Sequence, residues 1–122
     1  MCLSNTKKIG DTGEYTATNY CIQNLGYQIL NRNYKCEKFG EIDIVCKYQN
    51  FIIFVEVKTR SNAQYMPIYN VVDTRKMQAL KRAAQYYILK FKLQNLQHRI
   101  DLLTINNQTG EIEYFENITT PS

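Results

Sequence analysis

The chain has 122 residues, a formal net charge of +4, and a composition of 44% hydrophobic and 21% charged residues. This length suits a single domain over residues 1–122, and such a domain buries roughly two-thirds of its unfolded surface, enough for a core without disulfides. No apolar run approaches the roughly 20 residues of a membrane-spanning helix, and the N-terminus carries no apolar stretch of a signal peptide. We therefore expect a cytoplasmic protein with no membrane partner.

Cysteine spacing argues against a zinc site and against a disulfide framework. The four cysteines stand at positions 2, 21, 36 and 46, none of them in a CxxC pair, and His98 is the single histidine. A structural zinc site needs closely paired ligands, and disulfides need an oxidising compartment. We expect reduced thiols that pack as small apolar side chains.

The first half of the chain predicts a helix followed by strands. Residues 11–25 carry a helical apolar stripe, with Asp11 and Glu14 spaced as in a capping box and Gly26 as a stop. Residues 27–36 are strand-like, and 37–40 form a turn. Residues 42–48 and 51–58 are rich in β-branched and aromatic side chains, and only Gln49 and Asn50 separate them. A tight hairpin is expected there.

The second half predicts one more helix and two strands. Residues 61–70 form a loop that contains Pro67, and residues 74–92 have apolar positions at helical spacing. Strands are expected at 99–105 and at 111–115, with a turn at 107–110. The order αβββαβ, with a terminal strand added, predicts an α/β fold with a mixed central sheet flanked by helices.

The hairpin predicts where charged side chains lie. With a two-residue loop, the apolar pairs fall on one face, and they are Ile42 with Val57, Ile44 with Val55, and Cys46 with Ile53. On the other face Asp43 lies opposite Glu56, and Lys58 follows on the same side because side chains alternate along a strand. Opposed carboxylates destabilise a sheet unless a cation lies between them, and a hard divalent ion suits oxygen ligands.

Two alternatives stay open at this stage. Glu56 and Lys58 could form an ordinary solvent-facing pair, and such exposed pairs contribute little to stability. A three-residue loop would put Asp43 opposite Val55 and on the other face from Glu56. Against the first alternative, both strands are apolar around the charges, which is typical of central strands.

The motifs in their order resemble a known family. Asp43 followed by Glu56-Val57-Lys58 resembles the core of the PD-(D/E)xK nucleases, and the whole chain is similar to the YraN-type family, related in fold to archaeal Holliday junction resolvases. The matching stretches are residues 10–17, 31–33, 40–45, 54–60 and 99–101, together with Lys76 and Ala83-Ala84 in the second helix. The resemblance implies a restriction-endonuclease-like core and divalent-metal-dependent phosphodiester hydrolysis.

The resemblance also implies roles for individual residues. Asp43 and Glu56 would hold Mg²⁺ or Mn²⁺, with the Val57 carbonyl as a third ligand, and Lys58 would position the attacking water. Glu14 would project from the first helix toward the metal. The capping box with Asp11 is a competing role for Glu14, because an acidic residue in a first helical turn is favourable regardless of chemistry.

The basic residues predict that the partner is a nucleic acid, most of all DNA. Arg60 directly follows the ExK motif, and Lys76 and Lys81 belong to a basic cluster on the second helix. Such residues bind phosphate in a salt-dependent way, although a solvated helix face is an equally good interpretation of the cluster. Junction resolution would in addition imply a homodimer, since paired cuts need two active sites.

Two classes of function remain in view. The first is a nuclease that cuts DNA phosphodiester bonds in branched or single-stranded DNA. The second is a non-catalytic nucleic-acid-binding module that keeps the fold and the basic surface. Intact opposed carboxylates favour the enzyme, because a pure binder does not need them. A protein-interaction domain, a third class, predicts no salt-dependent DNA binding.

Overall fold

The computed structural model describes residues 5–61 and 72–119, with side chains from residue 13 onward. The predicted loop at 61–70, with Pro67, therefore lies almost wholly outside the described residues, as does Cys2. The elements in chain order are α1 (Asn5–Gln23), β1 (Gln28–Lys35), the 3-10 turn η1 (Glu37–Phe39), β2 (Glu41–Tyr48), β3 (Phe51–Arg60), α3 (Thr74–Lys90), β4 (Gln97–Asn106) and β5 (Ile112–Phe115). No helix among these is long and apolar enough to cross a membrane.

The five strands form one mixed sheet in the order β1-β2-β3-β4-β5. Neighbouring strands are antiparallel except β3 and β4, which are parallel and are joined through α3. A parallel pair needs a crossover connection, and here the helix supplies it. The predicted α/β class with a mixed sheet is confirmed, and the arrangement is consistent with a restriction-endonuclease-like core.

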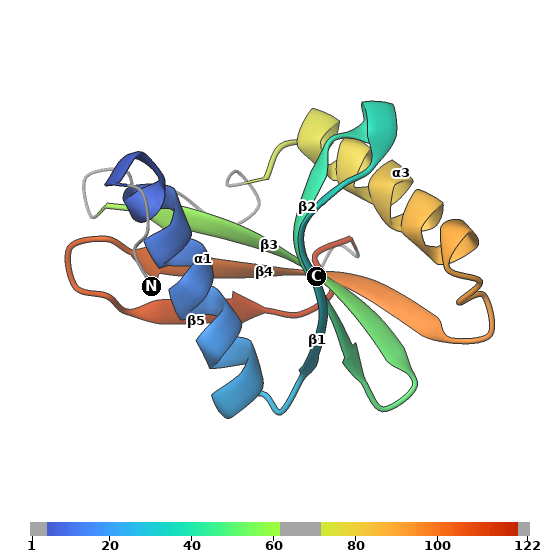
Figure 1. Ribbon diagram of the computed structural model, residues 1–122, viewed down its shortest axis with the longest axis horizontal. Helices are drawn as coiled ribbons and strands as arrows, with labels where there is room; N and C mark the ends of the chain where they lie inside the picture. The colour runs from blue at the N-terminus through green and yellow to red at the C-terminus, as the bar shows by residue number, and fades with distance from the viewer. Residues whose placement is uncertain (1–4, 62–71, 120–122) are drawn as a thin grey trace.

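The two helices cover opposite faces of the sheet. Alternate residues of β3 divide between two clusters: Ile52 and Phe54 pack against α3, and Ile53 and Val55 pack against α1. Figure 1 shows α1 crossing in front of the sheet and α3 at the upper right, beside β2. Because both faces are covered, β3 is buried from Ile52 to Glu56. The carboxylate of Glu56 must therefore find its partner inside the molecule.

Packing of the second helix follows its predicted apolar stripe. Leu80, Ala83, Ala84, Tyr87 and Ile88 are buried against the sheet, which confirms the period seen in the sequence. The helix begins at its N-cap Asp73, whose side chain accepts the Lys76 N–H at 2.8 Å.

The first helix corrects one prediction. The structure begins α1 at Asn5, not at Asp11, so Asp11 lies inside the helix and does not cap it. The capping-box interpretation of Asp11 and Glu14 is therefore wrong. The reason is that residues 5–10 continue the helix upstream, with Gly10 tolerated at a modest cost. Glu14 consequently lies in the middle of the helix.

The hairpin register is confirmed near the turn and departs from prediction further on. Tyr48 pairs with Phe51, as a two-residue loop requires, and the pairing continues to Ile44 with Val55. There it ends, while β2 goes on pairing with β1. Ile42 then packs in the α3 cluster, so the predicted pairing of Ile42 with Val57 is wrong. The two strands separate at Asp43.

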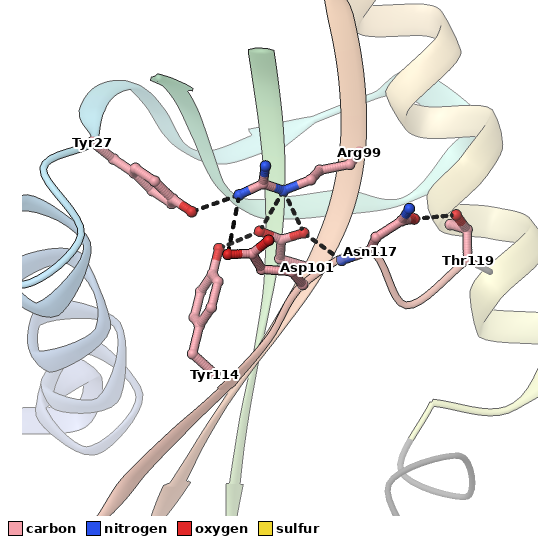
Figure 2. Close-up of polar contacts among 7 residues, drawn as sticks. Tyr27, Arg99, Asp101, Tyr114, Asn117 and Thr119 are labelled. Carbon is pink, nitrogen blue, oxygen red and sulfur yellow. Dashed lines mark hydrogen bonds and ion pairs between the residues drawn. The ribbon is translucent and has the colours of Figure 1, made fainter. Parts of the chain in front are cut away.

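A buried polar network fixes β4 to its surroundings (Figure 2). Asp101 is fully buried and accepts hydrogen bonds from Arg99 Nε at 3.1 Å, from the Tyr114 hydroxyl and from the Asn117 N–H at 2.8 Å. Arg99 also donates to the Tyr27 hydroxyl at 2.7 Å. The carboxylate thereby joins β4, β5 and the segment after β5, and Arg99 extends the network to Tyr27, just before β1.

The cysteines match the prediction as far as they are described. Cys21, Cys36 and Cys46 are free thiols and fully buried. They pack among apolar side chains in the two clusters.

Candidate functional site

The site is centred on Glu56, in the middle strand of the sheet. Glu56 lies on the face of β3 that α3 covers, between β2 and β4, and pairs with Leu102. The residue is 4% exposed. An ionised carboxylate in such a place loses most of its hydration, which is costly unless a cation or hydrogen-bond donors replace the water.

The two oxygens of Glu56 differ in their surroundings. Oε2 lies 3.6 Å from Lys76 Nζ, whereas Oε1 is buried with no hydrogen-bond partner among the described residues. Burial, and next the negative charge of Asp43, raise the pKa of Glu56 to about 7, against a lowering by Lys76 and Lys58. The unpartnered oxygen and the raised pKa both indicate a carboxylate that has lost more hydration than its neighbours replace.

Asp43 stands where β2 leaves β3. Its Oδ2 accepts a hydrogen bond from the Val57 N–H at 2.8 Å, so the side chain takes over a donor of β3 just past the last residue pair of the ladder. The Asp43 side chain is half-buried. Since the charge of Asp43 acts on Glu56, the two carboxylates lie near each other. They are not the directly opposed strand pair that the sequence predicted, because the pairing of β2 with β3 ends at Ile44 and Val55.

Lys58 completes the strand motif. It follows Glu56 by two residues on β3 and therefore lies on the same face. Its side chain is half-buried, and its charge lowers the pKa of Glu56. Val57 points to the opposite face, where it packs at the edge of the α1 cluster. The structure thus brings Asp43, Glu56 and Lys58 together.

The part of α1 that carries Glu14 lies at the same end of β3, on the other face of the sheet. The neighbouring Gly13 is so close to β3 that an added Cβ would lie 3.3 Å from Thr59 Oγ1. The helix therefore touches the strand one residue beyond Lys58. Glu14 is half-buried, and its main-chain carbonyl accepts a hydrogen bond from Thr18 Oγ1. Its role toward a metal stays a prediction.

The three predicted phosphate-binding residues lie in different places. Arg60 ends β3, where its carbonyl accepts the Asn107 N–H at 2.9 Å. Lys76 lies at the site itself, through its contact with Glu56. Lys81 is exposed and lines a separate pocket of about 260 Å³ between α3 and the start of β4, together with Gln85, His98 and Thr119. Lys81 is not brought to the carboxylates.

The donor set at Glu56 fits a hard divalent cation that keeps part of its water. Within the described ranges, no three acidic, histidine or cysteine side chains gather as a metal-binding group. Two carboxylates remain, with main-chain carbonyls beside them. Mg²⁺ is commonly bound by one or two carboxylates and retains several waters, and the unpartnered Oε1 of Glu56 is an acceptor of the kind it needs.

Sequence reasoning missed two features of this region. It placed Lys76 among the phosphate-binding residues, but not against Glu56, because the approach of α3 to the sheet depends on packing that no periodicity reports. It also gave Asp101 no role of its own. A signal was available there, since Asp101 is the single charged residue in the apolar run 100–105, and a buried charge needs partners.

Comparison with known proteins identifies relatives over most of the chain. The model of the family described as "Uncharacterised protein family UPF0102" matches residues 13–105. A UPF0102 protein from Clostridium botulinum is 43% identical over 109 residues, covering 88% of this chain and 87% of the relative. One from Caldanaerobacter subterraneus is 40% identical, covering 83% and 81%. One from Caldicellulosiruptor saccharolyticus is 34% identical, covering 93% and 98%.

Proposed function

The chain belongs to the uncharacterised family UPF0102, the YraN family, and from that premise we propose that it is a divalent-metal-dependent nuclease acting on DNA. The family name carries no activity, so the proposal depends on the site. Asp43, Glu56 and Lys58 are its central residues. Its expected substrates are branched or single-stranded DNA.

The observation that carries the proposal is the buried carboxylate oxygen of Glu56. A carboxylate that is 4% exposed, has one oxygen without a hydrogen bond and has a second carboxylate near it is unfavourable as a purely structural element. A like-charged pair is explained if the site exists to hold a cation. Perturbed carboxylates of this kind gather at functional sites.

Each side chain of the site has a role that follows from its position. Asp43 and Glu56 would hold the cation, with the Val57 carbonyl as a further ligand. The bound metal would supply a polarised water and charge neutralisation at the phosphate. Lys58 would orient that water and offset charge that builds on the phosphate oxygens. Glu14 would support the same end of β3 from α1, and Arg60 would contact a phosphate.

The charge distribution supports nucleic acid as the substrate. The net charge is +4, and several exposed cations lie along α3, namely Arg75, Lys81, Arg82 and Lys90. Lysine and arginine on one element form the electrostatic footprint expected of a phosphate-binding surface.

The test is a cleavage assay with labelled four-way-junction, single-stranded and duplex DNA, in Mg²⁺, Mn²⁺ or EDTA. We expect metal-dependent cutting by the wild type. The near-isosteric variants Asp43→Asn and Glu56→Gln should lower the rate by about a hundredfold or more, as should Lys58→Met, because each removes a group that acts in the transition state.

The matched control is Glu41→Gln, which removes an exposed carboxylate from the same strand as Asp43 and should leave the rate unchanged. Wild-type protein that binds DNA with a salt-dependent affinity but never cuts would support the binding module in place of the enzyme. Absence of both binding and cutting would contradict each of these and direct the search to a protein partner.

A further inference from the structure

Glu56 already has a cationic partner in this structure, and it comes from a helix rather than from the strand motif. Lys76 Nζ lies 3.6 Å from Glu56 Oε2. Among the ion pairs of the described residues, Lys76 alone is paired with Glu56. The distance exceeds ordinary hydrogen-bond length, so the contact is electrostatic and loose.

The backbone of Lys76 is fixed while its side chain has room to move. Its N–H donates to the N-cap Asp73 at 2.8 Å, and the next turn of α3 is packed on the sheet through Leu80. The side chain is 43% exposed, whereas that of Glu56 is 5% exposed. A lysine ammonium on a flexible four-carbon stem can thus reach either the buried carboxylate or the solvent.

Lys58 differs from Lys76 in its anchoring. It projects from β3 next to the carboxylates, at a point where β3 is still paired with β4, and is half-buried. Lys58 is therefore positioned for the reaction itself. Lys76 enters from α3, opposite the sheet, and its ammonium borders solvent.

We propose that Lys76 is an exchangeable counter-ion of Glu56. Lys76 pairs with the Glu56 carboxylate while no metal is bound, and it turns to a substrate phosphate when a metal is bound. The inference rests on the proposed metal-dependent function. Two cations that share one carboxylate repel each other, so metal binding and the Lys76 contact oppose each other. Released from Glu56, the ammonium lies at the mouth of the same site, where the substrate backbone must pass.

The first test measures metal binding without any reaction. Purified Lys76→Met, which keeps the length of the stem and removes the charge, is titrated with Mn²⁺ at pH 8.5, and free Mn²⁺ is followed by electron paramagnetic resonance. We expect the dissociation constant to fall by about three- to tenfold, since a nearby positive charge is lost. Lys76→Arg should stay within about twofold of the wild type for the same electrostatic reason.

Lys92→Met is the matched control, because Lys92 is exposed beyond the far end of α3, and it should bind Mn²⁺ like the wild type. Unchanged or weaker Mn²⁺ binding by a folded Lys76→Met protein would overturn the inference alone, whatever the cleavage assay shows. If neither the wild type nor Lys76→Met binds Mn²⁺, the metal-dependent function fails, and the inference fails with it.

The second test addresses the phosphate. Binding of single-stranded DNA is measured in Ca²⁺, used as a metal expected to occupy the site with little cutting, and in EDTA. Lys76→Met should weaken binding by about threefold or more in Ca²⁺ and less in EDTA, where the wild-type ammonium is still paired with Glu56. An equal loss in both conditions would contradict the exchange and assign Lys76 to the surface charge only.

Discussion

At the scale of single residues, the buried carboxylate of Glu56 lowers the stability of the metal-free protein and is the proposed ligand of the metal. Burial and the charge of Asp43 raise the pKa of Glu56 to about 7, well above its ordinary value. At a pH between the pKa of Glu56 in the unfolded chain and its higher pKa in the folded protein, the folded protein binds more protons than the unfolded chain. Its free energy of unfolding therefore falls as pH rises through this window. The metal-free protein is destabilised at neutral and alkaline pH by its own site.

Glu56→Gln should consequently stabilise the metal-free protein. In EDTA at pH 8 we expect the free energy of unfolding to rise by about 1 to 3 kcal/mol, because a charge that is buried in the folded state is removed. The gain should be much smaller at pH 4.5, where the carboxyl is protonated in the folded state. Urea unfolding at the two pH values measures the difference. Glu113→Gln, an exposed carboxylate of β5, is the control, and an equal gain from both variants would refute the argument.

At the scale of elements, β4 is held by polar contacts as well as by its ladders. Asp101 is fully buried on the α1 side of the sheet, and burial raises its pKa against the hydrogen bonds of Asn117, Tyr114 and Arg99. Arg99 also lies over the Phe51 ring, 5.2 Å from its centre. The network sets the position of β4, whose parallel partner β3 carries the candidate site.

Tyr114→Phe tests this network with the smallest change. The variant deletes only the hydroxyl that donates to Asp101, and a lost hydrogen bond to a charged group costs about 1.5 to 3 kcal/mol. Chemical denaturation should show a loss of that size. Tyr86→Phe, whose hydroxyl makes a long and exposed contact with Glu37, should change stability by less than about 0.5 kcal/mol. Equal effects of the two variants would show that the buried network is not special.

At the scale of the whole molecule, two cores lie on opposite faces of one sheet, and the candidate site and the basic surface of α3 occupy different places around them. Asp43, Glu56 and Lys58 lie where β2 and β3 separate, whereas Lys81 lies further along α3, beside the pocket next to β4. A DNA strand that contacts both the carboxylate site and Lys81 must run along α3. The Lys81 pocket would then bind a phosphate away from the reacting one.

Salt dependence of DNA binding measures that second contact. Each neutralised phosphate contributes about 0.7 to 0.9 to the slope of log affinity against log salt concentration. Lys81→Ala should lower the affinity and reduce the slope by about one such contribution. Lys92→Ala serves as the control. If the two variants behave alike, the α3 charges act as a diffuse solvated face, and Lys81 has no phosphate of its own.

Much of the fold followed from the sequence, because local patterns determine it. The two-residue turn at Gln49-Asn50 and the alternation of apolar residues set the hairpin register, and the helical period of residues 74–92 gave the buried face of α3. The placement of Glu56 and Lys58 on one face of β3 followed from that alternation. These features depend on residues that are near one another in the chain.

The remainder depended on contacts between distant segments. The pairing of β2 with β3 ends at Ile44 while β2 continues to pair with β1, and no local pattern reports that point. The approach of Lys76 to Glu56 requires the position of α3 on the sheet. Such effects override local propensity and are not visible in a single sequence.

The Asp101 network also has a consequence for synthesis on the ribosome. Asp101 is made before Tyr114 and Asn117, whose groups satisfy it once the chain is folded. A nascent chain that has emerged only as far as β4 must keep this carboxylate in water or close the sheet over a charge with too few partners. The full set of hydrogen bonds to Asp101 therefore requires β5 and the segment after it. The nascent protein gains the full set of partners for this buried charge only when nearly all of the described chain has been made.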